Sequence, residues 1–303
     1  MVYVKLLFTA FFWGGTFIAG RAIAGSVGPF SAAFVRFTVA SVFLVFFMHR
    51  FEGRLPRLKR HHVVPLLFLG LTGVLAYNAL FFKGLQYIEA GRAAVIIANN
   101  PILIAVFSAL LFKEKLRWFN AAGILLSVAG ATIVISKGHL SAIWTGGFGW
   151  GELLIFGCVC SWVTFSLIGK SVMAELSPLT CIGCASVIGA GLLFLPASLE
   201  GLWNDLGSYS GMDWLSLFYL GFFGTVLGFV WYYQGIKKIG PTKAGLFINF
   251  VPISAIILAF VILEEPLTPS LFLGTLLVCS GVYLTHRKTV PKFIFRPSVS
   301  HRS

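Results

Sequence analysis

The sequence predicts an all-α polytopic membrane protein with ten transmembrane helices, arranged as two inverted five-helix repeats. Three observations lead to this fold class: the composition, the recurrence of long apolar stretches, and a residue pattern that occurs twice. Of the 303 residues, 58% are hydrophobic and 11% are charged, whereas soluble domains carry about 25% charged residues. Because a helix satisfies its own backbone hydrogen bonds in lipid, such a chain is expected to form a helical bundle.

Ten stretches of the chain are long enough to cross a bilayer, which requires about 20 apolar residues. They are expected at residues 3–24, 30–50, 63–84, 92–112, 117–136, 150–172, 178–198, 211–236, 242–264 and 267–286. The connections between them are short, so we expect no separate soluble domain. The first stretch has no clear small-residue cleavage site after its apolar core, so we expect it to belong to the mature fold rather than to a signal peptide.

The net charge of +13 is distributed unevenly between the two sides of the predicted membrane. Most of the 23 Lys and Arg residues fall on the side of the N-terminus, and the other side carries only Arg21, Lys83, Arg92 and Lys137. Because cytoplasmic loops are enriched in basic residues, both termini, including a basic tail at 287–303, are expected in the cytoplasm. These cations are expected to meet anionic lipid headgroups. Nucleic-acid binding by the segment EGRLPRLKRHH is a weak alternative, and no nucleic-acid partner is expected.

The two halves of the chain carry the same residues at the same spacing. Trp13, Gly20 and Pro29 correspond to Trp162, Gly169 and Pro178. Farther along, Pro101, Glu114, Gly123 and Gly130 correspond to Pro252, Glu265, Gly274 and Gly281. We therefore expect a first repeat at 1–136, a linker at 137–149 and a second repeat at 150–286. Because five crossings are an odd number, the second repeat must have the opposite orientation, which is a transporter architecture with its site between the repeats.

With these residues in view, the chain resembles the EamA-type carriers of the drug/metabolite transporter superfamily over about residues 3–286. The resemblance rests on Trp13-Gly14-Gly15, on Arg36-Phe37, and on the Pro…Glu…Gly…Gly block in each half. It implies a ten-helix carrier in the inner membrane of a bacterial or archaeal cell, often an exporter of amino acids or other small metabolites. The second half departs from the pattern, because Ala185 takes the place of Arg36 and Trp162-Val163-Thr164 takes that of Trp-Gly-Gly. A cavity shared by the halves should therefore be asymmetric.

The residues expected to line a central substrate cavity are polar or aromatic and lie within the apolar stretches. They are Trp13, Thr16, Arg36, Tyr77, Asn78, Asn99, Asn100, Trp162, Trp231, Tyr232 and Asn249. Tryptophan favours the headgroup region, yet Trp13 and Trp162 fall near the middle of their stretches. They either form an aromatic wall of the cavity or pack between helices with the indole N–H bonded to a carbonyl.

Arg36 lies about two turns inside the second stretch. An ionisable residue at this depth is costly without a partner and is therefore a functional candidate. It has three interpretations: direct binding of an anion, a structural bond to carbonyls at helix ends, or extension of the side chain to the outer interface. Depth along the membrane predicts an outer polar cluster of Arg36, Tyr77, Asn78, Asn99 and Asn100, and an inner, more aromatic cluster of Trp231, Tyr232 and Asn249.

Pro101 and Pro252 are expected to act as hinges or kinks in the fourth and ninth stretches, because proline cannot donate the helical hydrogen bond. Asn99 and Asn100 beside the first break are expected to contact substrate or water, or else only to bond neighbouring helices. Glu114 and Glu265 are expected to be structural, for example by capping the N-terminus of the next helix, where negative charge is favourable.

Two pairs of glycines, two turns apart, are expected to let the fifth and tenth stretches pack closely. They are Gly123, Gly130, Gly274 and Gly281.

Several chemistries are disfavoured by what the sequence lacks. Every carboxylate lies at the end of a stretch or in a loop, with Glu152 as the nearest exception, so a proton-coupled exporter of cationic drugs is disfavoured. The CIGC segment lacks the second cysteine pair of a zinc site, and no phosphate-binding loop is present. We therefore expect no metal, no cofactor and no enzymatic activity.

These observations predict a secondary transporter, an exporter or a facilitator, that moves small metabolites such as amino acids across the inner membrane by alternating access. The alternatives are a flippase for a lipid-linked substrate, a drug or cation efflux carrier, and a membrane-embedded enzyme or scaffold. The expected partners are a small-molecule substrate and membrane lipids, and both a monomer and an oligomer remain open.

Overall fold

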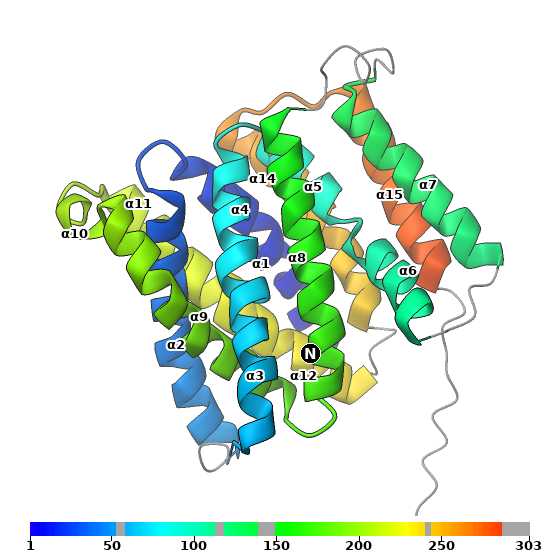
Figure 1. Ribbon diagram of the computed structural model, residues 1–303. Coiled ribbons are helices and arrows are strands. Elements are labelled where there is room, and N and C mark those ends of the chain that lie inside the picture. The colour runs from blue at the N-terminus through cyan, green and yellow to red at the C-terminus, as the bar shows by residue number, and fades with distance from the viewer. Residues whose placement is uncertain (53–57, 113–117, 139–148, 240–243, 287–303) are drawn as a thin grey trace, which may run out of the picture.

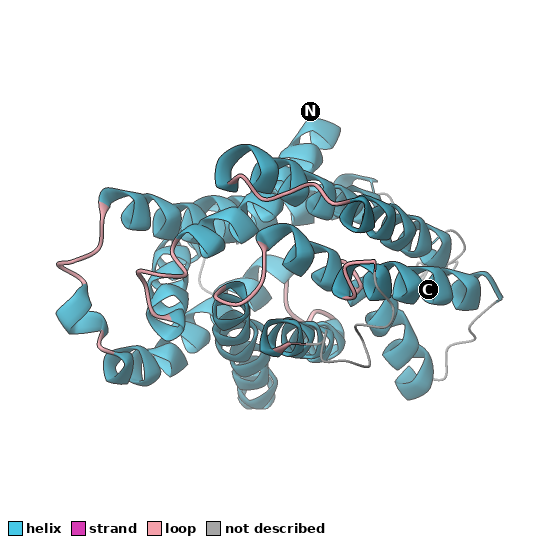
Figure 2. Ribbon diagram, turned by 90° about the horizontal axis from the view of Figure 1, so that it is seen from above, coloured by secondary structure: helices cyan, strands magenta, loops and turns pink. Residues whose placement is uncertain are grey.

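The computed structural model of the chain describes residues 1–52, 58–112, 118–138, 149–239 and 244–286, which form a bundle of helices (Figure 1). Glu114, the linker from residue 139 to 148 and the tail at 287–303 lie outside the described residues. In the described part the helices are joined by short loops and no strand is present (Figure 2).

The elements in chain order are α1 (Val2–Ala22), α2 (Pro29–Glu52), α3 (Arg60–Leu69), the π-helix η1 (Gly70–Ala76), α4 (Tyr77–Leu85), α5 (Ala90–Ile97), α6 (Asn100–Phe112), α7 (Trp118–Ile135), α8 (Trp150–Val172), α9 (Pro178–Glu200), α10 (Leu202–Asp205), α11 (Gly211–Phe218), the π-helix η3 (Tyr219–Leu227), α12 (Gly228–Ile239), the 3-10 turn η4 (Leu246–Asn249), α14 (Phe250–Leu263) and α15 (Pro269–His286).

Eight helical segments of the described chain are long and apolar enough to cross a membrane. They are Val2–Ala22, Pro29–Glu52, Arg60–Leu85, Ala90–Leu111, Trp118–Ile135, Trp150–Val172, Pro178–Glu200 and Gly211–Ile239. Two further apolar segments, Phe247–Leu263 and Pro269–Thr285, are shorter. Many large apolar side chains remain uncovered on the outer surface, such as Leu199 (79% exposed) and Phe272 (75% exposed). A multi-pass membrane protein accounts for this surface, because lipid rather than water would cover it.

Helices α2 and α9 pack against each other and run in opposite directions. The N-terminal end of α2 meets the C-terminal end of α9, because the backbone N–H and hydroxyl of Ser31 both donate to Glu200 Oε2, at 2.7 and 2.8 Å. At the opposite ends, Glu52 accepts hydrogen bonds from the hydroxyls of Ser177 and Thr180. Each helix therefore offers a carboxylate from its last turn to the first turn of the other, where negative charge is favourable.

Helices α1 and α8 also have opposite directions. The guanidinium of Arg21, at the C-terminal end of α1, donates to the carbonyl of Leu85. Gly151, at the N-terminal end of α8, packs closely on Ile88 in the following loop. The end of α1 and the start of α8 therefore lie at the same end of the bundle, beside the loop between α4 and α5.

Helices α7 and α15 pack closely and lie side by side in Figure 1. A Cβ atom on Gly123 would lie 2.6 Å from the carbonyl oxygen of Gly281, and one on Gly130 would lie 2.6 Å from that of Gly274. The two backbones therefore touch at two places, as small residues at a helix interface permit. Since the earlier glycine of α7 meets the later glycine of α15, these helices are antiparallel as well.

Two segments of π-helix interrupt the third and eighth membrane segments. In each, a glycine packs on a helix from the other half of the chain: a Cβ on Gly73 of η1 would lie 2.2 Å from Phe165 of α8, and one on Gly224 of η3 would lie 2.5 Å from Thr16 of α1. A π-helix shifts the backbone hydrogen bonds by one residue and frequently marks a functional site. Both segments contribute to the site described next.

Candidate functional site

A row of aromatic side chains connects the two halves of the chain. The ring centroid of Phe229 lies 5.5 Å from that of Trp13 and 6.3 Å from that of Trp162. Beyond the two tryptophans, Tyr232 lies 5.3 Å from Trp13 and Tyr77 lies 5.4 Å from Trp162. All five side chains are half-buried. The two tryptophans that occupy equivalent places in the halves are therefore joined through one phenylalanine.

Hydrogen bonds and close packing fix the orientation of Trp13. Its indole N–H donates to the carbonyl of Gly224 in η3, at 3.0 Å. A Cβ on Gly228 would lie 2.4 Å from the indole nitrogen, so only glycine leaves room for the ring there. The hydroxyl of Thr16 donates to the carbonyl of Trp13, at 2.6 Å. The indole is thus held by η3 and α12, which belong to the other half.

Arg36 is buried, with 8% of its surface exposed, and its hydrogen bonds are directed into the bundle. Its Nε donates to the Thr225 hydroxyl of η3, and its Nη1 donates to the side-chain oxygen of Asn78 at the start of α4, both at 3.0 Å. Thr225 donates to the carbonyl of Leu220, and Asn78 donates to that of Val74. One guanidinium therefore joins the two π-helical segments. No ion pair neutralises it among the described residues.

The two asparagines before Pro101 have contacts of a different kind. Helix α5 ends at Ile97 and α6 begins at Asn100, so the break falls just before the proline. The amide of Asn99 donates to the carbonyl of Val95, at 3.0 Å, and accepts from the hydroxyl of Ser127 in α7, at 2.8 Å. Asn100 is buried and its side-chain oxygen has no hydrogen-bond partner.

The residues of the expected outer polar cluster therefore do not all bond one another; they form two separate groups. Arg36 and Asn78 bond each other beside Tyr77, while Asn99 bonds toward α7. The sequence placed these residues at similar depth, but depth does not determine on which side of a helix a side chain lies.

The residues expected on the inner side also separate. The Trp231 ring lies 5.6 Å from the Phe12 ring and 5.6 Å from the ammonium group of Lys5. Tyr232 belongs to the aromatic row. The backbone carbonyl of Asn249 accepts from the Cys279 thiol, at 3.5 Å, just before α14 and Pro252. The second hinge residue therefore also follows a break in its helix.

Glu265 lies at a helix N-terminus in the other half of the chain. Its carboxylate accepts the backbone N–H groups of Ala90 and Gly91, at 2.8 and 3.1 Å. It therefore caps α5 rather than α15, the next helix in the chain that the sequence favoured. The reason is geometric: α14 and α5 are antiparallel neighbours, so the end of one meets the start of the other.

A buried ion pair was not anticipated from the sequence. Arg92 of α5 and Glu152 of α8 are 9% and 4% exposed, and Nη2 of the first lies 2.6 Å from Oε1 of the second. The same nitrogen donates to the carbonyl of Ile135 at the end of α7. Arg92, which the sequence assigns to the side with few cations, is covered by α5, α7 and α8 rather than exposed there. Their proximity, which buries the pair, is not visible in sequence spacing.

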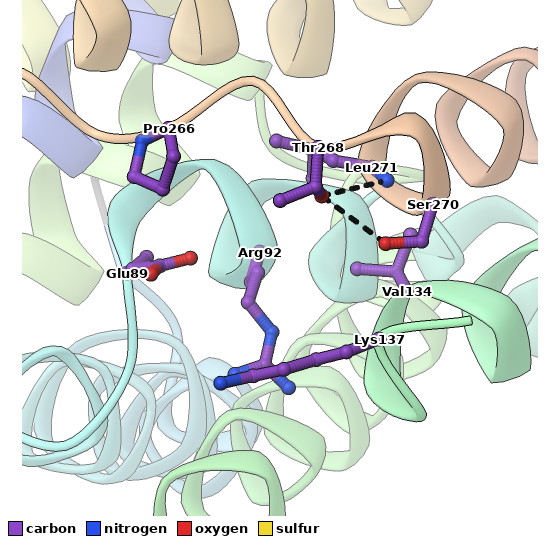
Figure 3. Close-up of a pocket in the computed structure, with 8 residues that line it drawn as sticks. All are labelled: Glu89, Arg92, Val134, Lys137, Pro266, Thr268, Ser270 and Leu271. Atoms are coloured by element: carbon purple, nitrogen blue, oxygen red, sulfur yellow. Dashed lines mark hydrogen bonds between the residues drawn. The ribbon is translucent and has the colours of Figure 1, made fainter. Parts of the chain in front are cut away.

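Two cavities lie beside this ion pair. One, of about 160 Å³, is lined by Arg92 together with Glu89, Lys137, Thr268 and Ser270 (Figure 3). The other, of about 240 Å³, is mainly apolar, and its polar lining comes from Asn99, Thr132 and Glu152.

The residues at the centre of the predicted site have a different environment. Trp13, Arg36 and Trp162 line neither cavity. The two tryptophans pack within the aromatic row, and Arg36 bonds Thr225 and Asn78. Among the expected cavity residues, Asn99 does line one.

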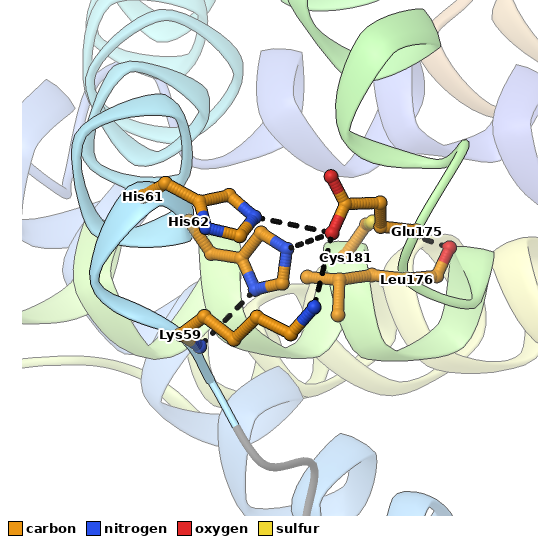
Figure 4. A network of polar contacts seen from close by, with 6 residues as sticks. All are labelled: Lys59, His61, His62, Glu175, Leu176 and Cys181. Carbon is orange, nitrogen blue, oxygen red and sulfur yellow. Dashed lines mark hydrogen bonds and ion pairs between the residues drawn. The ribbon is translucent and has the colours of Figure 1, made fainter.

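A polar network joins the two halves at the opposite end of the bundle (Figure 4). The Nε2 atoms of His61 and His62 lie 3.1 and 3.2 Å from Glu175 Oε2, and the Lys59 ammonium lies 3.7 Å from the same oxygen. The two histidines and the carboxylate lie within 4.8 Å of one another, close enough to share a metal ion. However, Nδ1 of His62 accepts the backbone N–H of Lys59, at 3.3 Å. This bond leaves the proton of the neutral ring on Nε2, so the contacts favour a hydrogen-bonded network over a metal site.

This network should make stability depend on pH. Hydrogen bonds from His61 and His62 hold the pKa of Glu175 below its ordinary value of 4.5. A lowered carboxyl pKa contributes stability that is present above the unfolded pKa and is lost as the pH falls through the folded pKa. We expect Glu175→Gln to melt at a lower temperature than the wild type at pH 6, with the difference shrinking as the pH falls below the ordinary pKa and disappearing below the lowered pKa of the folded state. Melting curves in detergent measure it, and a difference that does not change with pH would contradict the interpretation.

Two residues of the site carried no signal of their own in the sequence, and a third, Glu152, stood out only as the carboxylate nearest to an exception. Phe229 looks like a lipid-facing residue, and Thr225 looks like a helical threonine that bonds its own backbone. Glu152 looks like a first-turn carboxylate, which it also is, since it accepts the backbone N–H of Gly149. The repeat offered one clue, because Phe229 occupies the position in the second half that Asn78 has in the first, at the spacing that relates Pro101 to Pro252.

Several known proteins similar to this chain are named as transporters. An "Uncharacterized transporter YyaM" of Bacillus subtilis is 31% identical over 282 residues, covering 93% of this chain and 92% of the other. A "Probable terminal-alkyne amino-acid exporter" of Streptantibioticus cattleyicolor is 26% identical over 285 residues, covering 94% and 93%. A solved crystal structure matches the fold with a TM-score of 0.67 at 21% identity, covering 94% of this chain and 96% of the other.

The model of the EamA-like transporter family matches residues 1–136 and 149–287. These residues include both tryptophans of the aromatic row, Arg36, and the glycines at which α7 meets α15. Together with the apolar, all-helical fold, the match identifies the molecule: the chain belongs to the EamA-like transporter family.

Proposed function

We propose that this chain is a secondary transporter that moves small metabolites, such as amino acids, across the inner membrane by alternating access. The observation that carries the proposal is the junction of the halves. One guanidinium, Arg36, bonds η3 directly and reaches η1 through Asn78, and the aromatic row passes from Trp13 to Trp162. Both features lie where two halves of a carrier must separate. In the present conformation they are packed, so passage of a substrate requires the halves to move apart.

The fold supports ten crossings arranged as two inverted repeats. Phe247–Leu263 and Pro269–Thr285 serve as the ninth and tenth crossings, because each occupies the place of a membrane segment in the first half. The corresponding helices α1 and α8, α2 and α9, and α7 and α15 have opposite directions, as inversion requires. Basic residues at the ends of the bundle then support cytoplasmic termini.

An amino acid or another small metabolite fits this site better than a cationic drug. The single buried charge at the junction is the cation Arg36, which favours an anionic or zwitterionic group. The buried carboxylate of Glu152 is already paired with Arg92, so it does not offer a free negative charge. The relative named as a probable amino-acid exporter points to the same substrate class.

Flux through reconstituted vesicles tests the proposal. We expect labelled amino acids to cross, and Trp13→Ala and Arg36→Lys to reduce the rate at least about tenfold, since each removes an oriented contact at the junction. Trp150→Ala is the matched control, because Trp150 is 72% exposed and lies outside the aromatic row. Absence of flux for a broad panel of metabolites, or equal losses for Trp150→Ala, would count against the proposal.

A further inference from the structure

The cavity of Figure 3 combines charged groups that precede the second half of the chain with hydroxyl groups from the second half. Arg92 lies in α5 and Glu89 just before it, Lys137 follows α7, Thr268 lies just before α15 and Ser270 lies in its first turn (Figure 3). The side chain of Lys137 extends toward the guanidinium of Arg92, so two cations point to one place. Glu152 already pairs with Arg92 through Nη2, so the cation of this cavity that lacks a carboxylate partner among the ion pairs of described residues is Lys137.

The polar groups of this cavity are incompletely paired. Arg92 is buried, with 11% of its side chain exposed, and its Nε has no hydrogen-bond partner, although its Nη2 is bonded. Glu89 precedes α5, but its carboxylate does not cap that helix, because Glu265 accepts the N–H groups of Ala90 and Gly91. None of the ion pairs between described residues includes Glu89 or Lys137. A cation and a carboxylate therefore face the cavity without a partner in the protein.

The backbone of Lys137 supports a functional role for its side chain. Its φ angle is +51°, a left-handed conformation that favours glycine and costs other residues about 1–2 kcal/mol. At the end of a helix this position is usually glycine. Lys137 is exposed, so packing does not explain a lysine at this position, and a role for its ammonium group at the cavity is consistent with the strain.

We propose that this cavity binds a small zwitterion, an α-amino acid, with its carboxylate between Arg92 and Lys137 and its ammonium group at Glu89. The hydroxyls of Thr268 and Ser270 add donors on the carboxylate side. A volume of about 160 Å³ is below the roughly 300–1,000 Å³ of sites for drug-sized ligands, so a short side chain fits best. This proposal rests on the proposed function and names the substrate class. The binding site that it assigns is separate from the central junction of the halves.

Binding of L-serine to the purified full-length protein, measured by isothermal titration calorimetry, tests this assignment. Propionate lacks the ammonium group and ethanolamine lacks the carboxylate, so we expect each to bind at least about tenfold more weakly, the loss of one charge-assisted contact. We expect Glu89→Gln to weaken serine binding to a similar extent. Lys83→Gln is the control, because Lys83 is an exposed lysine near the same end of the bundle and lies outside the cavity.

Lys137→Gly separates binding from folding. Glycine removes the cation but relieves the left-handed backbone, so we expect an equal or higher melting temperature together with at least a tenfold loss of serine affinity. Serine affinity that survives both Lys137→Gly and Glu89→Gln would overturn the proposal, as would equal binding of serine and ethanolamine. Flux of serine that both variants leave unchanged would overturn this site while leaving the proposed transport function intact. If both variants weaken serine binding but no metabolite crosses the membrane, the binding site would stand and the proposed transport function would be overturned.

Discussion

Replacement of Glu152 by glutamine is expected to lower the free energy of unfolding by about 3–5 kcal/mol. The substitution leaves the Arg92 guanidinium buried and charged without its partner at 2.6 Å, and an uncompensated buried charge is strongly destabilising. Glutamine keeps an oxygen that can accept the N–H of Gly149 at the start of α8, so the loss of the helix cap contributes little. The effect should appear as a lower midpoint in denaturant unfolding of the protein in micelles.

The double variant Arg92→Met with Glu152→Gln isolates the interaction between the two charges. Arg92→Met alone should also destabilise, because it leaves the carboxylate buried without the guanidinium. The double variant should be more stable than either single variant, since replacing a whole buried ion pair is often neutral or even stabilising. A double variant whose loss equals the sum of the single losses would show that the charges do not depend on each other.

Gly281→Ala is expected to cost about 1–3 kcal/mol by forcing α7 and α15 apart. The added methyl group would lie 2.5 Å from the carbonyl oxygen of Gly123 and 2.7 Å from the backbone nitrogen of Ser127. Both are backbone atoms, so no side-chain rotation can make room. Gly123→Ala should have a similar effect, because it meets the same contact from the other helix.

Gly191→Ala is the matched control for this prediction. Gly191 lies within α9, and a Cβ there meets no atom within 4 Å. Because alanine favours the helix by about 1 kcal/mol over glycine, this variant should melt at the same or a higher temperature. Equal melting temperatures for Gly281→Ala and Gly191→Ala would show that the α7–α15 contact does not constrain the fold.

The helices could be predicted because hydrophobicity alone determines where a chain can cross lipid. The second stretch, expected at 30–50, is α2 at Pro29–Glu52, and the sixth, expected at 150–172, has the bounds of α8. The interruption of the third stretch by η1 could not be predicted in the same way. It involves Gly70 and Gly73, which pack on Ile188 and Phe165 in the other half, and such contacts depend on tertiary structure.

In the candidate site, too, some residues could be predicted from the sequence and others could not. Arg36 and the two tryptophans stand out in sequence because charge and mid-span indole are unusual in lipid. Their partners Thr225 and Phe229 do not, since a threonine and a phenylalanine are ordinary in any membrane helix. The Arg92–Glu152 pair was missed for a related reason, because each residue lies near a helix end where exposure is the simpler expectation. Only the packing of α5, α7 and α8 buries them.

The cap that Glu265 provides for α5 has a consequence for the synthesis of this protein. Ala90 precedes its acceptor by 175 positions, and ribosomes add roughly 5–20 residues per second. The N–H groups at the start of α5 therefore wait about 9–35 s for their partner. Until then water or lipid headgroups must satisfy these N–H groups. The five crossings of the first half are therefore inserted before the cap of α5 can form. The loop that follows α14 completes the first half only when the second is almost finished.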